Sequence, residues 1–479
     1  MLVRLVKPLT HPAQVDLLTI ASSLIPIGFR CPSYSRITSP DGFADMLPCL
    51  LDHHSCCRIG AMLNVAFRER NATKKVTAFR ALDKCSMQVA VSTTRPFHSA
   101  LLANALVKHG SRVRIYSSAP RRYFRRLDPS VRISLVPSLL QTAMHFAHIP
   151  ASPNVLHADS WLYDHSVATV IRLSADDVFI GWATASLATA RAAKRRGARF
   201  VLDRACPHVD FQENIIAEES AKLGIPYRPQ PTWFRDRQLA EYEEAEHILT
   251  PSEYTRATFS DALRAKIIKA PLFGRCAFPS KTHPERHAEF TVGVVGGDPV
   301  RKGYLYLLEA WERLALTNAR LLIRSDAGFA RLPALAQRLA RLRDVEIVHY
   351  VPDINDFYQR CDVFVLPSVD DGFGMALFEA MANGVACVAT SHCGSAELLT
   401  PGRDGIVVPP RDADLLAEAL LSLYQQEELR RALAVAGRAT AAALGRNDSS
   451  PLYDAAIGTL LDSLSAPRSV AAAARSAEA

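Results

Sequence analysis

Two acidic residues, Asp371 and Glu379, are separated by seven residues in a stretch whose pattern predicts a ligand site. The apolar run 363–367 before them is typical of a buried parallel strand, and a helix is predicted to begin near Met375 and to end at 383–384. Ligands of open α/β sheets bind at the carboxyl ends of the strands, where free N–H groups at a helix start favour anions. Because a carboxylate accepts hydrogen bonds from two neighbouring hydroxyls, acids beside an anion site predict a sugar diol next to a phosphate.

A second candidate loop, residues 294–303, joins a predicted strand to a predicted helix and contains Gly296, Gly297, Arg301 and Lys302. The glycine pair allows a ligand to come close to the backbone. The two cations lie near the helix start and add positive charge beside the free backbone N–H groups there. A solvated pair of surface cations is the alternative interpretation.

Strands that alternate with helices predict an α/β protein with two Rossmann-like domains, each with a parallel sheet, facing across a cleft. We expect the strands of the first domain at residues 87–92, 113–116, 133–136, 155–157, 178–182, 200–203 and 247–250. We expect those of the second at residues 291–295, 320–324, 345–348, 363–367, 385–389 and 406–408. Helices are predicted at residues 99–109, 304–315, 357–361, 375–383, 413–424 and 451–464.

These elements predict four parts of the 479-residue chain. Residues 1–85 show no steady alternation of strands and helices and are expected to be an irregular N-terminal extension. The first Rossmann-like domain is expected at residues 86–285, with a linker at 278–287, and the second at residues 286–445. Residues 446–479 are expected to contain a helix that packs back on the body and a disordered tail after residue 465.

The composition, 49% hydrophobic and 22% charged, is that of a globular protein. No apolar run reaches the length that crosses a bilayer, and we expect a cytoplasmic location. The net charge of +8 suggests an anionic partner. In the cluster 121–126, aromatic residues between arginines suit peripheral contact with the anionic inner face of a membrane, and a solvated helix face is the alternative. No nucleic-acid motif accompanies the charge, so no nucleic-acid partner is expected.

The acid pair and its surroundings resemble a known family. The runs Asp371-Gly372-Phe373-Gly374 and Glu379-Ala380-Met381-Ala382 resemble the signature of the retaining family 4 (group 1) glycosyltransferases, which have the two-Rossmann GT-B fold. The resemblance implies that Glu379 holds the ribose hydroxyls of a nucleotide sugar and that Asp371 touches the transferred sugar. The family usually has glutamate at the position of Asp371. The donor-binding residues implied around the pair are Gly372, Phe373, Gly374 and Met375.

The same resemblance extends to other predicted site residues. Lys302 corresponds to the family's lysine, which neutralises the diphosphate leaving group together with an arginine. Gly297 stands at the position of that arginine, and whether Arg301 replaces it is left open. Val351 belongs to a run whose backbone contacts the nucleobase in the family.

In the first domain, Arg204 and His208 follow a predicted strand and resemble an Arg and His four apart in a subset of the family. The resemblance implies contact with the sugar or acceptor for both, and His208 is our third catalytic candidate beside Lys302 and Asp371. A histidine that stabilises the turn after Pro207 is an equally good interpretation.

The resemblance implies a retaining transferase that moves a sugar from a nucleoside-diphosphate donor to a glycan or lipid-linked acceptor, in polysaccharide or lipopolysaccharide biosynthesis. No cofactor and no metal are expected. One alternative is a noncatalytic nucleotide-sugar-binding protein, because Gly297 and the glycine-free loop 93–98 depart from the family pattern. The other is a nicotinamide-dependent Rossmann enzyme, because Gly293, Gly296 and Gly297 follow a strand and Asp326 closes the next one. Their spacing is not Gly-x-Gly-x-x-Gly, and the acid pair would have no role in such an enzyme.

Overall fold

The computed structural model describes residues 87–136, 153–273, 278, 289–326, 328–445 and 450–466. The expected N-terminal extension, most of the expected linker and nearly all of the tail expected after residue 465 lie outside these residues. Among the described helices, none combines the length and the apolar character that a membrane span requires.

The first half of the described chain forms a seven-stranded sheet in the order β3-β2-β1-β4-β5-β6-β7. All its neighbouring strands are parallel. The strands are β1 (Gln88–Thr93), β2 (Arg112–Ser117), β3 (Arg132–Leu135), β4 (Val178–Trp182), β5 (Arg199–Asp203), β6 (His247–Thr250) and β7 (Ile267–Lys269). The helices of this half are α4 (Ser99–Lys108), α6 (Pro153–Val170), α7 (Leu187–Lys194), α8 (Val209–Lys222), α9 (Thr232–Glu244), α10 (Glu253–Ala257) and α11 (Asp261–Arg264), with the 3-10 helix η1 (Arg121–Phe124).

The strand expected at residues 155–157 is wrong, because these residues belong to α6. Three apolar or aromatic residues in a row do not distinguish a strand from a helix. The burial decides it, since Val155, Ala158, Tyr163 and Val167 are buried at helical spacing. The edge strand β7 was not expected, and its three residues are too few to give a periodic signal.

The second half forms a six-stranded parallel sheet in the order β10-β9-β8-β11-β12-β13. Its strands, all expected from the sequence, are β8 (Phe290–Val295), β9 (Ala319–Arg324), β10 (Val345–Val348), β11 (Val363–Leu366), β12 (Ala386–Thr390) and β13 (Ile406–Val408). Its helices are α12 (Tyr304–Leu314), α13 (Pro333–Arg341), α14 (Ile354–Gln359), α15 (Met375–Ala382), α16 (Ala413–Gln425) and α17 (Glu427–Leu444), with η2 (Phe329–Arg331) and η3 (Gly394–Leu398).

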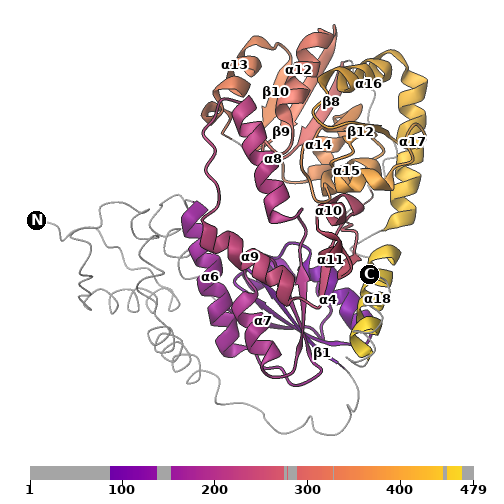
Figure 1. Cartoon of the computed structure of the whole chain (residues 1–479). Helices are drawn as coiled ribbons and strands as arrows, with labels where there is room; N and C mark the ends of the chain where they lie inside the picture. Colours follow the sequence, from indigo (N-terminus) through magenta and orange to yellow (C-terminus); the bar gives the residue numbers. More distant parts are fainter. Residues whose placement is uncertain are drawn as a thin grey trace, which may run out of the picture. The chain divides into compact units, whose positions relative to one another are not determined.

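The central strands β4, β5, β11 and β12 are buried along their whole length. This is typical of parallel sheets covered by helices on both faces, and Figure 1 shows the helices around each sheet. The last helix, α18 (Pro451–Ser465), packs against α4 and β7 of the first half. Ser463 Oγ lies 2.8 Å from His247 Nε2 on β6.

Helix α8 follows the first sheet's strand β5 in sequence, but it packs with the second sheet. Ile215 and Leu223 belong to the same hydrophobic core as the strands β8 and β9. Tyr306 on α12 donates a hydrogen bond of 2.9 Å to the buried Glu219 of α8, and Figure 1 shows the two helices in the same region. This helix therefore ties the two halves together.

In both sheets the strand order reverses beside the first strand, between β1 and β4 and between β8 and β11. Ligands of open α/β sheets bind in the crevice at such a switch point, outside the carboxyl ends of the strands. The switch point of the second sheet is flanked by the loops 296–303 and 367–374, which contain most of the predicted donor-binding residues.

Candidate functional site

The two loops at the β8/β11 switch point are in direct contact. Val369 N donates a hydrogen bond of 2.9 Å to Arg301 O. Gly303 has a φ of +66°, and a Cβ at this position would overlap the carbonyl oxygen of Pro367. Only glycine allows so close an approach without strain. The sequence therefore brings the cation-bearing loop against the acid-bearing loop.

Lys302 and Asp371, predicted from the two loops, form an ion pair between Nζ and Oδ2. Both side chains are largely buried, with exposed fractions of 21% and 14%. The stem of Lys302 covers Gly296, where a Cβ would lie 2.7 Å from Lys302 Cγ. The backbone of Asp371 is fixed by Asp371 N donating to His392 O at 3.0 Å. A cation and a hydroxyl acceptor thus lie side by side at the carboxyl ends of two adjacent strands.

The second predicted acid, Glu379, lies on α15, the helix that starts at Met375 directly after the acid-bearing loop. Its Oε2 accepts a hydrogen bond of 2.8 Å from the Tyr358 hydroxyl of α14. Burial raises the pKa of Glu379, and the hydrogen bond from Tyr358 opposes this shift. Val351, in the loop before α14, is partly buried against the hydrophobic core.

Residues of the first half of the chain contact the loop after Asp371. The Gly372 carbonyl oxygen accepts hydrogen bonds from Ser252 Oγ at 2.6 Å and from Thr255 Oγ1 at 3.0 Å. A Cβ on Gly372 would overlap the carbonyl oxygen of Ala205, in the loop after β5. The glycine therefore permits the backbone contact between the two halves.

Arg204 and His208 lie in that same loop after β5. Arg204 is buried, and its guanidinium donates to Pro207 O at 2.7 Å and to Gln238 Oε1 at 3.1 Å. His208 caps α8, where its Nδ1 accepts from Asp210 N at 3.3 Å. Burial lowers the pKa of His208, which favours the neutral imidazole that this cap requires. The geometry fits the turn-stabilising interpretation, and a contact with sugar or acceptor stays a prediction for both residues.

A further polar pair lies at the carboxyl edge of the first sheet and was not predicted. His98 Nε2 lies 2.8 Å from Asp203 Oδ2, and its ring packs at 4.6 Å from that of Trp182. Beside them, Phe97 has a φ of +32° and remains 56% exposed. These residues come from the ends of three strands, so no short sequence motif indicates their proximity.

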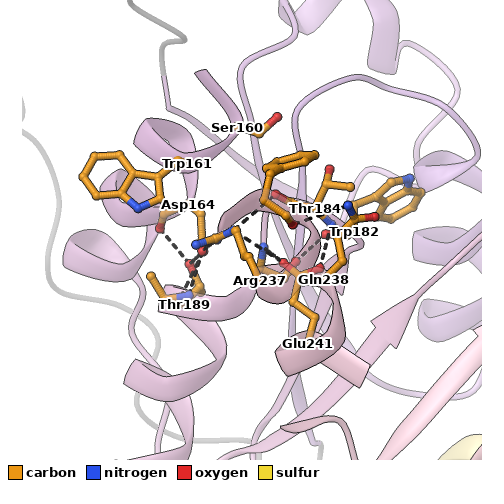
Figure 2. A network of polar contacts seen from close by, with 12 residues as sticks. Ser160, Trp161, Asp164, Trp182, Thr184, Thr189, Arg237, Gln238 and Glu241 are labelled. Atoms are coloured by element: carbon orange, nitrogen blue, oxygen red, sulfur yellow. Dashed lines mark hydrogen bonds and ion pairs between the residues drawn. The ribbon is translucent and has the colours of Figure 1, made fainter. Parts of the chain in front are cut away.

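Figure 2 shows a buried network that fixes the loop after β4. Glu241 of α9 accepts hydrogen bonds from Thr184 N at 2.7 Å and from Ser186 N at 2.9 Å. Asp164 of α6 accepts from Thr189 N at 2.9 Å, and Arg237 forms an ion pair with Asp164. Two carboxylates with one guanidinium between them thus hold the start of α7, where free N–H groups favour negative charge.

Within the described ranges, no group of three or more His, Cys, Asp or Glu residues is placed to hold a metal ion.

Comparison with known proteins finds a family match in the second half of the chain. Residues 289–426 match the family model described as glycosyl transferases group 1. The chain is 38% identical over 90 residues to the N,N'-diacetylbacillosaminyl-diphospho-undecaprenol alpha-1,3-N-acetylgalactosaminyltransferase of Campylobacter jejuni, a match covering 18% of this chain and 24% of the relative. It is 27% identical over 164 residues to the capsular polysaccharide biosynthesis glycosyltransferase CapM of Staphylococcus aureus, covering 33% of this chain and 43% of the relative. The chain thus spans less than half the length of these curated relatives.

Solved structures agree with the two-sheet architecture. Anabaena HepE, solved in complex with UDP and glucose, has a TM-score of 0.56 and 15% sequence identity, and the match covers 78% of this chain and all of HepE. At this identity the likeness concerns the fold, and it extends over both sheets. Residues 289–426 therefore match the group 1 glycosyltransferase model, and the chain has the two-sheet GT-B fold.

Proposed function

We propose that this protein is a retaining glycosyltransferase that moves a sugar from a nucleoside-diphosphate donor to a glycan or lipid-linked acceptor in polysaccharide or lipopolysaccharide biosynthesis. The observation that carries the proposal is the pairing of Lys302 with Asp371 where the loops after β8 and β11 meet. The group 1 domain match over residues 289–426 supports it.

In this proposal each partner of the ion pair has a role when a donor binds. Lys302 would turn from Asp371 to the diphosphate and stabilise the charge that develops as it leaves. Asp371, freed from the lysine, would accept hydrogen bonds from hydroxyls of the transferred sugar, while Glu379 accepts those of the ribose. The leaving phosphate would take the proton of the attacking acceptor hydroxyl. HepE, with the same fold, was solved with UDP and glucose, and this supports a nucleotide-sugar donor.

The acceptor side of the proposal includes contact with the cytoplasmic face of a membrane. Arg121, Arg122 and Arg125 are exposed, and the Arg122 guanidinium lies 5.2 Å from the ring centre of the half-exposed Tyr123. Exposed arginines with an aromatic side chain among them suit an anionic lipid surface. The relative from Campylobacter carries an undecaprenol-linked substrate in its name, which fits a lipid-linked acceptor here.

One observation favours the noncatalytic nucleotide-sugar-binding protein as a second candidate. Gly297 stands where the family has an arginine, so this position supplies no cation. Among the described residues, no other side chain takes that place within 4 Å of a Cβ at this position. Of the predicted site residues in this loop, Lys302 and Arg301 would then supply the positive charge for a leaving diphosphate.

Thermal shift with UDP-, GDP- and ADP-sugars, followed by donor turnover with several acceptors, separates these functions. The proposal predicts a raised unfolding temperature with one donor class and slow hydrolysis or transfer of its sugar. Product from an α-linked donor is expected to keep the α configuration in its NMR spectrum. Donor binding without hydrolysis or transfer would favour the binding protein, and no shift with any donor would refute both.

A further inference from the structure

Asp370, the residue before Asp371, is a fully buried carboxylate outside the predicted site. None of its surface is exposed, and its Oδ2 accepts from Arg301 Nε at 3.0 Å and from Gln212 Nε2 at 2.7 Å. Its Oδ1 accepts from the Tyr254 hydroxyl at 3.0 Å. A buried charge is costly unless it is paired and hydrogen-bonded, and three donors meet this need.

The three donors come from separate elements. Arg301 lies in the loop before α12, whereas Gln212 lies on α8 and Tyr254 on α10. The ring of Tyr254 also stacks on His392, with ring centres 4.9 Å apart. Burial, followed by the negative charge of Asp370, raises the pKa of Tyr254, so this hydroxyl keeps its proton and remains a donor. Asp370 is thus fixed from both halves of the chain.

Arg301 is the one cation in this group, and its geometry leaves part of the guanidinium available. Across the described part of the chain, its side chain hydrogen-bonds through Nε alone. The side chain is 25% exposed, and Gly297, four residues earlier in the same loop, leaves open space. A guanidinium held at its Nε edge can present its two Nη groups to an oxyanion as a fork.

We propose that Asp370 is a positioning residue that holds Arg301 by Nε and directs its Nη groups to the donor diphosphate, with Tyr254 and Gln212 fixing the carboxylate. This inference rests on the proposed function, since it assigns the residue that orients the diphosphate-binding cation. It gives a role to Arg301 beside Lys302, and it makes diphosphate binding depend on side chains from the first half of the chain.

The test compares binding of a nucleoside diphosphate with binding of its nucleoside. The probe is whichever of UDP, GDP and ADP stabilises the wild-type protein most, together with uridine, guanosine or adenosine. Asp370→Asn keeps the shape but removes the charge that holds Arg301, and a lost charge-assisted hydrogen bond corresponds to about tenfold or more in affinity. We expect diphosphate affinity to fall by this factor and nucleoside affinity to stay unchanged.

Two more variants keep the test decisive if Asp370→Asn does not fold. Arg301→Lys keeps the charge but lacks the two Nη groups of the guanidinium. We expect it to lower the ratio of diphosphate affinity to nucleoside affinity by about tenfold. Tyr254→Phe removes the hydroxyl that donates to Asp370 from the first half of the chain, and we expect the same ratio to fall by about threefold. Tyr424→Phe, which removes the hydroxyl that donates to Thr317 O at 2.8 Å, is the matched control and should change neither affinity.

Equal losses of diphosphate and nucleoside affinity would show a general structural role and overturn the inference. An unchanged ratio in all three variants would overturn it as well, while leaving the proposed function intact. Failure of the wild-type protein to bind any of the three diphosphates would instead refute the proposed function.

Discussion

The buried Glu241 offers a test of the network in Figure 2 through the pH dependence of stability. Its side chain is fully buried, and its oxygens accept the backbone N–H groups of Thr184 and Ser186. Burial raises the pKa of Glu241 from 4.5 to about 7, although the charge of Arg237 and the two N–H groups lower it. The perturbation is Glu241→Gln, which keeps the shape and removes the titration.

The size and sign of the effect follow from the two pKa values. Because the folded-state pKa lies above the unfolded one, the folded protein binds more protons between them, and stability falls as pH rises through this window. The difference of 2.5 units between 4.5 and about 7 corresponds to about 3 kcal/mol. This contribution is fully present below the unfolded pKa and is lost above about pH 7.

Urea unfolding of both proteins at several pH values measures this effect. We expect the free energy of unfolding of the wild type, minus that of Glu241→Gln, to fall by about 2–3 kcal/mol between about pH 5 and about pH 8. Groups common to both proteins, such as His157 and His208, cancel in this difference. Glu243→Gln, on the exposed side of the same helix, is the matched control. Parallel stability curves for wild type and Glu241→Gln would refute the reasoning.

Three further predictions concern the site and the surface. Lys302→Ala should slow transfer by about 10²–10³ in single-turnover kinetics while changing the donor dissociation constant far less, and equal changes would contradict a role in leaving-group stabilisation. Gly372→Ala should lower the free energy of unfolding in urea by about 1–3 kcal/mol, because its Cβ has no room; unchanged stability would argue against the close backbone contact. Arg121→Glu with Arg122→Glu should reduce cosedimentation with phosphatidylglycerol vesicles by at least tenfold, at about 1 kcal/mol per charge removed. Arg431→Glu, exposed on α17, is its control, and equal losses would point to net charge alone.

The sequence predicted the second sheet well because its signals are local. Each of its strands is a short, mainly apolar run, and the acid-bearing loop lies directly between β11 and α15. The helix that carries Glu379 was expected to begin at Met375 and to end at Asn383–Gly384, and α15 spans Met375–Ala382 with Asn383 as its cap. Residues close in sequence therefore revealed the acid pair and the cations.

Contacts between residues that lie far apart in the sequence could not be predicted from it. Gln212 and Tyr254 reach Asp370 from 158 and 116 residues away, so no spacing pattern connects them. The amphipathic pattern of a helix predicts that it buries one face but not against which sheet, and Ile215 of α8 lies in the core of the second sheet. The ion pair between Lys302 and Asp371 likewise joins residues 69 positions apart, and it emerged from the three-dimensional structure.

The central claim is that Glu379 holds the ribose of a nucleotide donor, and isothermal titration with the donor nucleotide tests it most directly. We expect Glu379→Ala to weaken binding of the nucleoside diphosphate by about tenfold or more, since hydrogen bonds to a carboxylate are lost. The 2′,3′-dideoxy analogue of the nucleotide should bind the wild type as weakly as the complete nucleotide binds Glu379→Ala, and its affinity should not fall further in the variant. The exposed control Glu418→Gln should bind the complete nucleotide with wild-type affinity. Unchanged affinity of Glu379→Ala for the complete nucleotide would contradict the account.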